Sequence, residues 1–115
     1  MVDSSKLVRP LQVAVAVCML SSAVSLAAQA QTSSAIARGH AVAQEACAGC
    51  HAMDGKGGSV VQGIRVPSLG AIADRPNWSS ERLKSLITTP RHPMPAIPLG
   101  SSEIDDVVAY ILSLR

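Results

Sequence analysis

The chain has 115 residues, of which 48% are hydrophobic and 16% charged, so its length suits one domain and its composition excludes a disordered chain. Its formal net charge of +2 is too small to predict binding to nucleic acid. One Trp, one Tyr and no Phe leave few aromatic side chains for a core. A chain with so little core material needs a covalent bridge, a metal or a large apolar cofactor.

Residues 1–30 have the features of a secretory signal peptide. Two basic residues precede an apolar stretch from Leu11 to Leu26. The small residues Ala28 and Ala30 then occupy the two positions that a signal peptidase recognises. The sequence therefore predicts cleavage after Ala30, export to the periplasm and a mature domain of residues 31–115.

The competing interpretation of the same segment is an uncleaved membrane anchor. Its uninterrupted apolar run, Val13–Leu20, is shorter than the roughly 20 residues that span a bilayer, and it reaches that length only if serines are included. The pattern favours cleavage, so membrane contact is expected only through the precursor. Cleavage removes Cys18 and leaves 8 basic and 7 acidic residues, a balance that predicts no particular partner.

Cys47-Ala48-Gly49-Cys50-His51 is the C-x-x-C-H pattern of c-type haem attachment. Two thiols at this spacing can add to the two vinyl groups on one porphyrin edge, and the following His offers a nitrogen to the iron. A thioredoxin-like pair needs a βαβ pattern that this sequence lacks. A zinc site needs two further ligands at close spacing. The sequence thus predicts one haem c bound through Cys47 and Cys50, with His51 as an iron ligand.

Over about residues 35–115 the sequence resembles the class I c-type cytochromes, specifically the small bacterial monohaem kind. Four features carry the resemblance in order: Gly39 eight residues before Cys47, the attachment motif, Pro93-Met94-Pro95, and a terminal helical segment at 106–111. The resemblance implies an all-α cytochrome c fold, with three to four helices around one covalently attached haem c.

The resemblance also implies how two helices pack. A glycine at the position of Gly39 lets the last helix approach closely, which pairs it with Tyr110. At Ala43 relatives often carry a bulkier apolar residue, so this position departs from the family's packing.

Three further residues take roles from the resemblance. Pro67 is expected to accept the ring N–H of His51 with its carbonyl and so to fix the ligand's orientation. Trp78 is expected to hydrogen-bond a haem propionate, or else to pack on the haem. Arg75 is a weaker candidate for the same carboxylate.

The remaining elements follow from caps and periodicity. Ser33 or Ser34 is expected to cap the first helix, and Ser79 or Ser80 begins another that Pro90 ends. The glycine-rich residues 52–70 indicate a loop, and the sequence there lacks the pattern of a phosphate-binding loop. A last helix is expected from Ser101 or Ser102 to Leu114, capped by serine. Its apolar stripe consists of Ile104, Val107, Val108, Ile111 and Leu114.

The second iron ligand is expected in residues 90–100, where four prolines in nine residues favour stiff extended backbone. Met53 is too close in sequence to His51 to reach the opposite face of the haem. His92 and Met94 lie two residues apart, so in an extended chain they point the same way, and geometry leaves both open. The Pro-Met-Pro setting and the resemblance favour Met94.

Together these features predict a one-electron carrier rather than an enzyme, because His51 and Met94 would fill both axial positions. His/Met ligation raises the reduction potential. Partners are expected to be redox protein donors and acceptors, met as a monomer in transient complexes. One alternative is a haem sensor or peroxidase-like protein in which Met94 is not bound. The other is a cytochrome subunit of a periplasmic dehydrogenase complex.

Overall fold

The computed structural model describes residues 27–115, and most of the predicted signal segment lies outside this range. The chain divides into two compact units, Met1–Thr32 and Ser33–Arg115. Residues 27–32 of the first unit and residues 33–46 of the second are helical. Ser33 and Ser34 therefore lie within helical residues, and the prediction that one of them caps a helix is wrong. None of the helices between residues 27 and 115 is long and apolar enough to cross a membrane.

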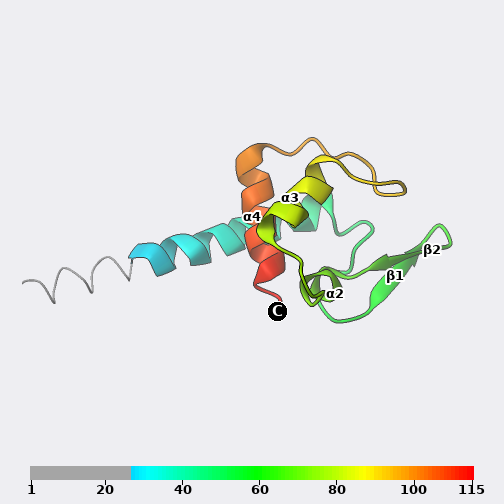
Figure 1. Cartoon of the computed structure of the whole chain (residues 1–115), viewed down its shortest axis with the longest axis horizontal. Coiled ribbons are helices and arrows are strands. Elements are labelled where there is room, and N and C mark those ends of the chain that lie inside the picture. Colours follow the sequence, from blue (N-terminus) through cyan, green and yellow to red (C-terminus); the bar gives the residue numbers. More distant parts are fainter. Residues whose placement is uncertain (1–26) are drawn as a thin grey trace, which may run out of the picture. The chain divides into compact units, whose positions relative to one another are not determined.

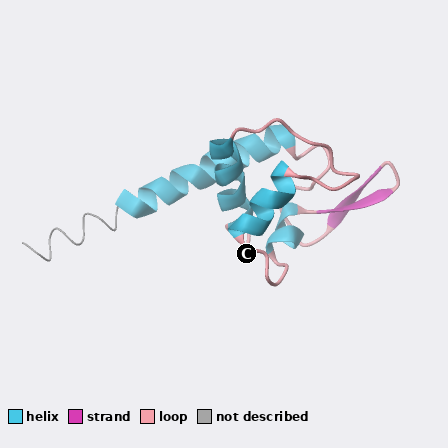
Figure 2. Ribbon diagram, turned by 45° about the horizontal axis from the view of Figure 1, so that its top comes forward, coloured by secondary structure: helices cyan, strands magenta, loops and turns pink. Residues whose placement is uncertain are grey.

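The second unit is mostly helical, as predicted for a cytochrome c fold. After the helical residues 33–46 come a hairpin and three helices (Figures 1 and 2). The helices are α2 at Leu69–Ala73, α3 at Ser80–Thr88 and α4 at Ser101–Leu112. They surround a core whose buried apolar residues are Ala43, Leu69, Ala73, Leu83, Ile104, Val107, Val108, Tyr110 and Ile111.

The prediction of a loop over residues 52–70 is wrong where two strands form and where α2 begins at Leu69. Strands β1 (Gly58–Val61) and β2 (Ile64–Pro67) pair antiparallel, with Val61 opposite Ile64. The turn residues Gln62 and Gly63 have φ of 51° and 79°, the positive values that a tight two-residue hairpin turn requires. The hairpin projects away from the helices (Figure 1).

Helix α4 packs against the first helix at Gly39. A Cβ atom built on Gly39 would lie 1.9 Å from the Asp106 carbonyl oxygen and 2.9 Å from Tyr110 Cβ. This confirms the predicted close approach and its pairing with Tyr110. Arg38 holds the contact through a bidentate ion pair of 2.7 and 2.9 Å with the Asp106 carboxylate. Hydrogen bonding to Arg38 holds the pKa of Asp106 below its usual value. Ala43 is fully buried, so its small side chain is part of this packing.

Gly39→Ala is expected to destabilise the protein, because the added methyl group meets backbone that cannot turn aside. The clash is removed only if the two helices move apart. Such overpacking lowers the free energy of unfolding by about 1–3 kcal/mol. Thermal or denaturant unfolding measures the change. Gly57→Ala is the matched control, since a Cβ there meets no atom within 4 Å. A Gly39→Ala variant as stable as the wild type would contradict the observed helix contact.

The caps of α2 and α3 are serines. Ser68, which is 1% exposed, accepts from the Ala71 N–H at 3.1 Å and donates to the Gly55 carbonyl at 2.8 Å, so it fastens α2 to the segment after the haem motif. Ser79 caps α3 by accepting from the Arg82 N–H at 3.3 Å, as predicted. These caps fix the chain on both sides of α2.

The N-cap of α4 differs from the prediction. Gly100 occupies the cap position, and Ser101 begins the helix. The Glu103 carboxylate accepts from the Gly100 N–H at 2.7 Å. This is the bond that the glutamate makes in a capping box, and it takes the place of the predicted cap by a serine hydroxyl. The predicted apolar stripe is confirmed at Ile104, Val107, Val108 and Ile111, which are buried. Leu114 lies beyond the end of the helix and is half-buried.

Candidate haem site

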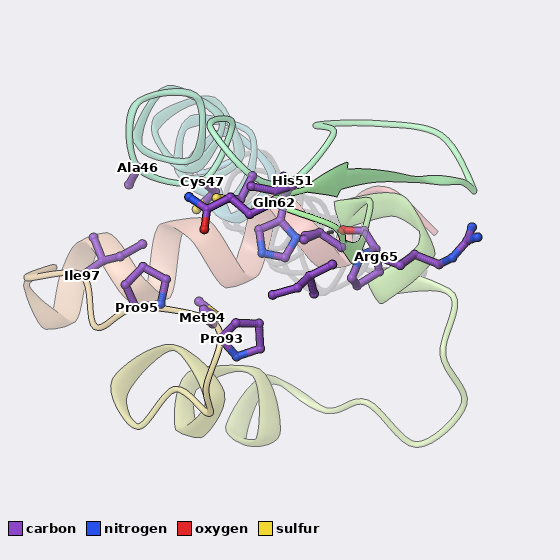
Figure 3. A pocket seen from close by; sticks show the side chains of 14 residues that line it. Ala46, Cys47, His51, Gln62, Arg65, Pro93, Met94, Pro95 and Ile97 are labelled. Atoms are coloured by element: carbon purple, nitrogen blue, oxygen red, sulfur yellow. Dashed lines mark hydrogen bonds between the residues drawn. The ribbon is translucent and has the colours of Figure 1, made fainter.

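A pocket of about 420 Å³ lies between the haem-attachment motif, the hairpin and the proline-rich loop (Figure 3). Its volume is within the usual range for a ligand site. Five predicted site residues line it, namely Cys47, Cys50, His51, Pro67 and Met94. The other lining residues are Ala46, Val61, Gln62, Ile64, Arg65, Val66, Pro93, Pro95 and Ile97.

The attachment motif forms one wall of the pocket because it folds as a tight turn directly after a helix. The helix reaches residue 46, and the Cys50 and His51 N–H groups both donate to the Cys47 carbonyl, at 3.1 and 2.9 Å. Cys47, Cys50 and His51 all line the pocket, and Figure 3 shows Cys47 and His51 on the same wall. No disulfide joins Cys47 to Cys50. Burial raises the pKa of Cys47, which favours its neutral thiol at neutral pH.

The His51 ring is oriented by β2. Its Nδ1 lies 2.8 Å from the Pro67 carbonyl oxygen, so the Nδ1–H tautomer donates this bond. Nε2 then carries the lone pair that a metal needs. Pro67 is held in place because it pairs with Gly58 at the base of the hairpin.

Met94 lies across the pocket from this wall. Figure 3 shows Pro93 and Met94 on the side opposite Cys47 and His51, with Ile97 at the end of the pocket. Met94 is half-buried, and its N–H donates to the Arg91 carbonyl at 3.0 Å. His92 is exposed and does not line the pocket. Of the two residues that the sequence left open, only Met94 therefore contributes to the pocket wall.

Met53 and Trp78 lie outside the pocket lining. Met53 is half-buried against the core, and its carbonyl accepts from the Tyr110 hydroxyl at 3.3 Å. Trp78 is also half-buried against the core, with the guanidinium carbons of Arg75 and Arg82 at 5.2 and 5.6 Å from its ring centre. The structure thus brings Trp78 together with cations rather than with the other predicted site residues.

The hairpin supplies a wall of the pocket that the sequence did not predict. This wall consists of Val61, Gln62, Ile64, Arg65 and Val66. Two signals for it were present: β-branched residues on both sides of the turn, and Gly63 at a turn position that needs positive φ. The Gly-rich sequence around them favoured a loop instead.

The pocket's chemistry fits a haem. Its walls are mainly aliphatic carbon and proline rings, while its sulfur and nitrogen donors are two thiols, one imidazole and one thioether. Imidazole and thioether are known axial donors to haem iron. Figure 3 shows Cys47 and His51 on one wall and Met94 on the opposite side, so these residues could hold a haem between them.

A second cavity of about 340 Å³ adjoins the first. It is lined by Lys56, Gly57, Gly58, Arg65, Pro67 and Arg75. Arg65 and Pro67 line both cavities. The charged residues that line the second cavity are Lys56, Arg65 and Arg75, and Lys56 is paired with Asp74.

A mostly helical domain with this thiol, imidazole and thioether pocket has the features of a small c-type cytochrome. Residues 34–111 match the family described as "Cytochrome C oxidase, cbb3-type, subunit III", and the chain belongs to this family. The chain is 40% identical over 94 residues to cytochrome c-552 of Bradyrhizobium diazoefficiens, with 78% of this chain and 88% of the relative covered. No solved structure matches it significantly. Membership in this family implies covalently bound haem c and electron transfer.

Proposed function

We propose that the mature chain is a periplasmic one-electron carrier, with a single haem c attached to Cys47 and Cys50 and with His51 and Met94 as its axial ligands. The observation that carries the proposal is one pocket lined by both thiols, with His51 and Met94 on opposite sides. The predicted signal peptide supports the location. The relative's similar length supports a small independent carrier, since 88% of it is covered.

In this proposal the protein contributes position and electrostatics, and the haem, when bound, supplies the one-electron chemistry. Pro67 keeps the His51 ring turned so that Nε2 can reach the iron. The proline-rich loop holds Met94 in place and so reduces the entropy that a weak thioether ligand loses on binding. With both axial positions filled by side chains, no position remains for a substrate.

Trp78 and Arg75 complete the proposed haem environment. Arg75 lines the second cavity beside the haem pocket, and its guanidinium lies over the Trp78 ring. We propose that Arg75 binds a haem carboxylate and that the Trp78 ring holds the Arg75 guanidinium in position. Trp78 thus acts on the haem through Arg75.

A second candidate is a fixed redox subunit of a larger complex, because the matching family is named for a subunit of an oxidase. Purification of the exported protein decides between the two. The carrier is expected to elute alone, and a subunit is expected to elute with other chains at a fixed ratio.

A redox titration tests the carrier function. The purified protein is expected to show one reversible one-electron transition, a low-spin spectrum in both states and the sulfur-to-ferric-iron charge-transfer band. Added carbon monoxide should leave the ferrous spectrum unchanged, because Met94 occupies the sixth position. Rapid carbon monoxide binding with a high-spin spectrum would instead favour the sensor or peroxidase-like alternative.

A further inference from the structure

The hairpin is joined to the haem-attachment motif by a hydrogen bond from each of its strands. On β1, the Ser59 hydroxyl donates to the Cys50 carbonyl at 2.6 Å. On β2, the Pro67 carbonyl lies 2.8 Å from Nδ1 of His51. Adjacent residues of the motif are therefore bonded to the two strands of one hairpin.

The bond from Ser59 satisfies a carbonyl group that the motif leaves without a backbone donor. Within the motif, the Cys50 and His51 N–H groups both donate to the Cys47 carbonyl. No backbone N–H of residues 27–115 donates to the Cys50 carbonyl. Because a carbonyl without a protein donor depends on water, the Ser59 hydroxyl takes the place of a solvent molecule and replaces it with a fixed link to β1.

The same bond fixes the strand that forms a wall of the haem pocket. Along β1, Ser59 and Val61 are half-buried, while Gly58 and Val60 are exposed. Side chains two apart in a strand share a face, so Ser59 lies on the same face as Val61, which lines the pocket. The hairpin projects away from the helices (Figure 1), and its position therefore depends on the bonds at its base.

The pairing of the strands connects Ser59 to the support of the iron ligand. Ser59 lies directly opposite Val66, the residue that precedes Pro67. A movement of β1 away from the motif therefore carries β2 with it and lengthens the bond between Pro67 and His51. The two bonds at this junction favour each other, because each holds in place the strand pair on which the other depends.

We infer that Ser59 is a positioning residue of the haem site, an inference that rests on the proposed function and its His51 ligation. The Ser59 hydroxyl holds the hairpin on the attachment motif, and the hairpin in turn holds the Pro67 carbonyl against the His51 ring. Ser59 thus acts on the iron only through Pro67 and His51. Its contribution is to keep the imidazole in one orientation during electron transfer.

Hydrogen–deuterium exchange of the ferrous holoprotein, followed by NMR, tests this role. Ser59→Ala is expected to speed exchange of the His51 Nδ1–H about fivefold, the change in an opening equilibrium that the loss of one hydrogen bond typically produces. The amides of the hairpin should exchange faster as well. The amides of α4 should exchange as in the wild type, because the opening is local. Ser59→Thr keeps a hydroxyl on a β-branched residue suited to a strand and should restore the slow exchange.

Ser113→Ala is the matched control. The Ser113 hydroxyl also donates to a backbone carbonyl at 2.6 Å, that of Tyr110, but it does so at the end of α4. Ser113 lines neither cavity. Its replacement removes an equivalent hydrogen bond from the same domain and should leave the exchange of the His51 Nδ1–H unchanged.

Three results would overturn the role of Ser59. The first is a Ser59→Ala variant in which the His51 Nδ1–H exchanges as in the wild type. The second is an equal increase for the amides of α4, because a general loss of stability would then explain the effect. The third is a Ser59→Thr variant that exchanges as fast as Ser59→Ala. A wild-type protein without a low-spin haem spectrum would instead contradict the proposed function.

Discussion

Replacing both Cys47 and Cys50 with Ser is expected to yield an exported chain without covalent haem and without a stable fold. The pocket between the hairpin and the proline-rich loop measures about 420 Å³ and has mainly apolar walls. Without the haem these apolar walls would face water, and the chain would lose the stabilisation that their burial provides. Native domains have a net stability of only about 5–15 kcal/mol, so such a loss is large. The variant should therefore collapse or be degraded.

Mass spectrometry of periplasmic protein measures this result. The wild type is expected to be a chain beginning near Gln31 that carries the mass of one haem, and the double variant should lack that mass. Cys18→Ser is the internal control, since cleavage after Ala30 removes residue 18. A folded, stable wild-type chain of the mature length without haem would overturn the haem assignment. A mature mass that changes with Cys18→Ser would show that the signal prediction is wrong.

The features that the sequence predicted well depend on local patterns. The C-x-x-C-H spacing needs only one helical turn to bring its three side chains to the pocket, so adjacent residues contain all the information. Ser79 caps α3 through a bond to a residue three positions along the chain. The contact at Gly39 is long-range, but the family resemblance supplied its partner, and the structure confirms it.

The features that the sequence did not predict fall into two groups. In some, two local patterns are equally compatible with the sequence, and in others the structure depends on residues far apart in the chain. At the start of α4, two serines suggested a hydroxyl cap, yet the Glu103 carboxylate satisfies the Gly100 N–H and shifts the cap one residue earlier. In the hairpin, Gly63 fitted a loop as well as a turn, but with Gln62 it forms the turn that allows the two strands to pair. The position of Trp78 depends on Arg75, Arg82 and the packed core together, which no short pattern encodes.

The choice between His92 and Met94 shows what the three-dimensional structure adds. An extended strand would point both side chains the same way. In the structure the backbone of this loop turns, with the Met94 N–H bonded to the Arg91 carbonyl, and residues two apart are no longer equivalent. Met94 becomes half-buried in the pocket wall while His92 stays exposed. The local turn thus separates two candidates that periodicity treats alike.

Met94→Ala is expected to have the largest effect on the electronic properties of the haem. Loss of the thioether opens the sixth position, abolishes the sulfur-to-iron charge-transfer band and lowers the reduction potential, because thioether ligation favours ferrous iron. Axial ligation sets haem potentials over a range of about 0.8 V, so the shift should be readily measured. Optical spectra and a redox titration of the purified holoprotein give both quantities.

His92→Ala is the matched control for this prediction, because it lies two residues away on the same loop and is exposed. It should keep the charge-transfer band and a potential close to that of the wild type. The opposite pattern, in which His92→Ala loses the low-spin spectrum and Met94→Ala keeps it, would mean that two imidazoles bind the iron. The loop would then have to turn His92 inward from its exposed position, and the proposal of a high-potential carrier would be withdrawn.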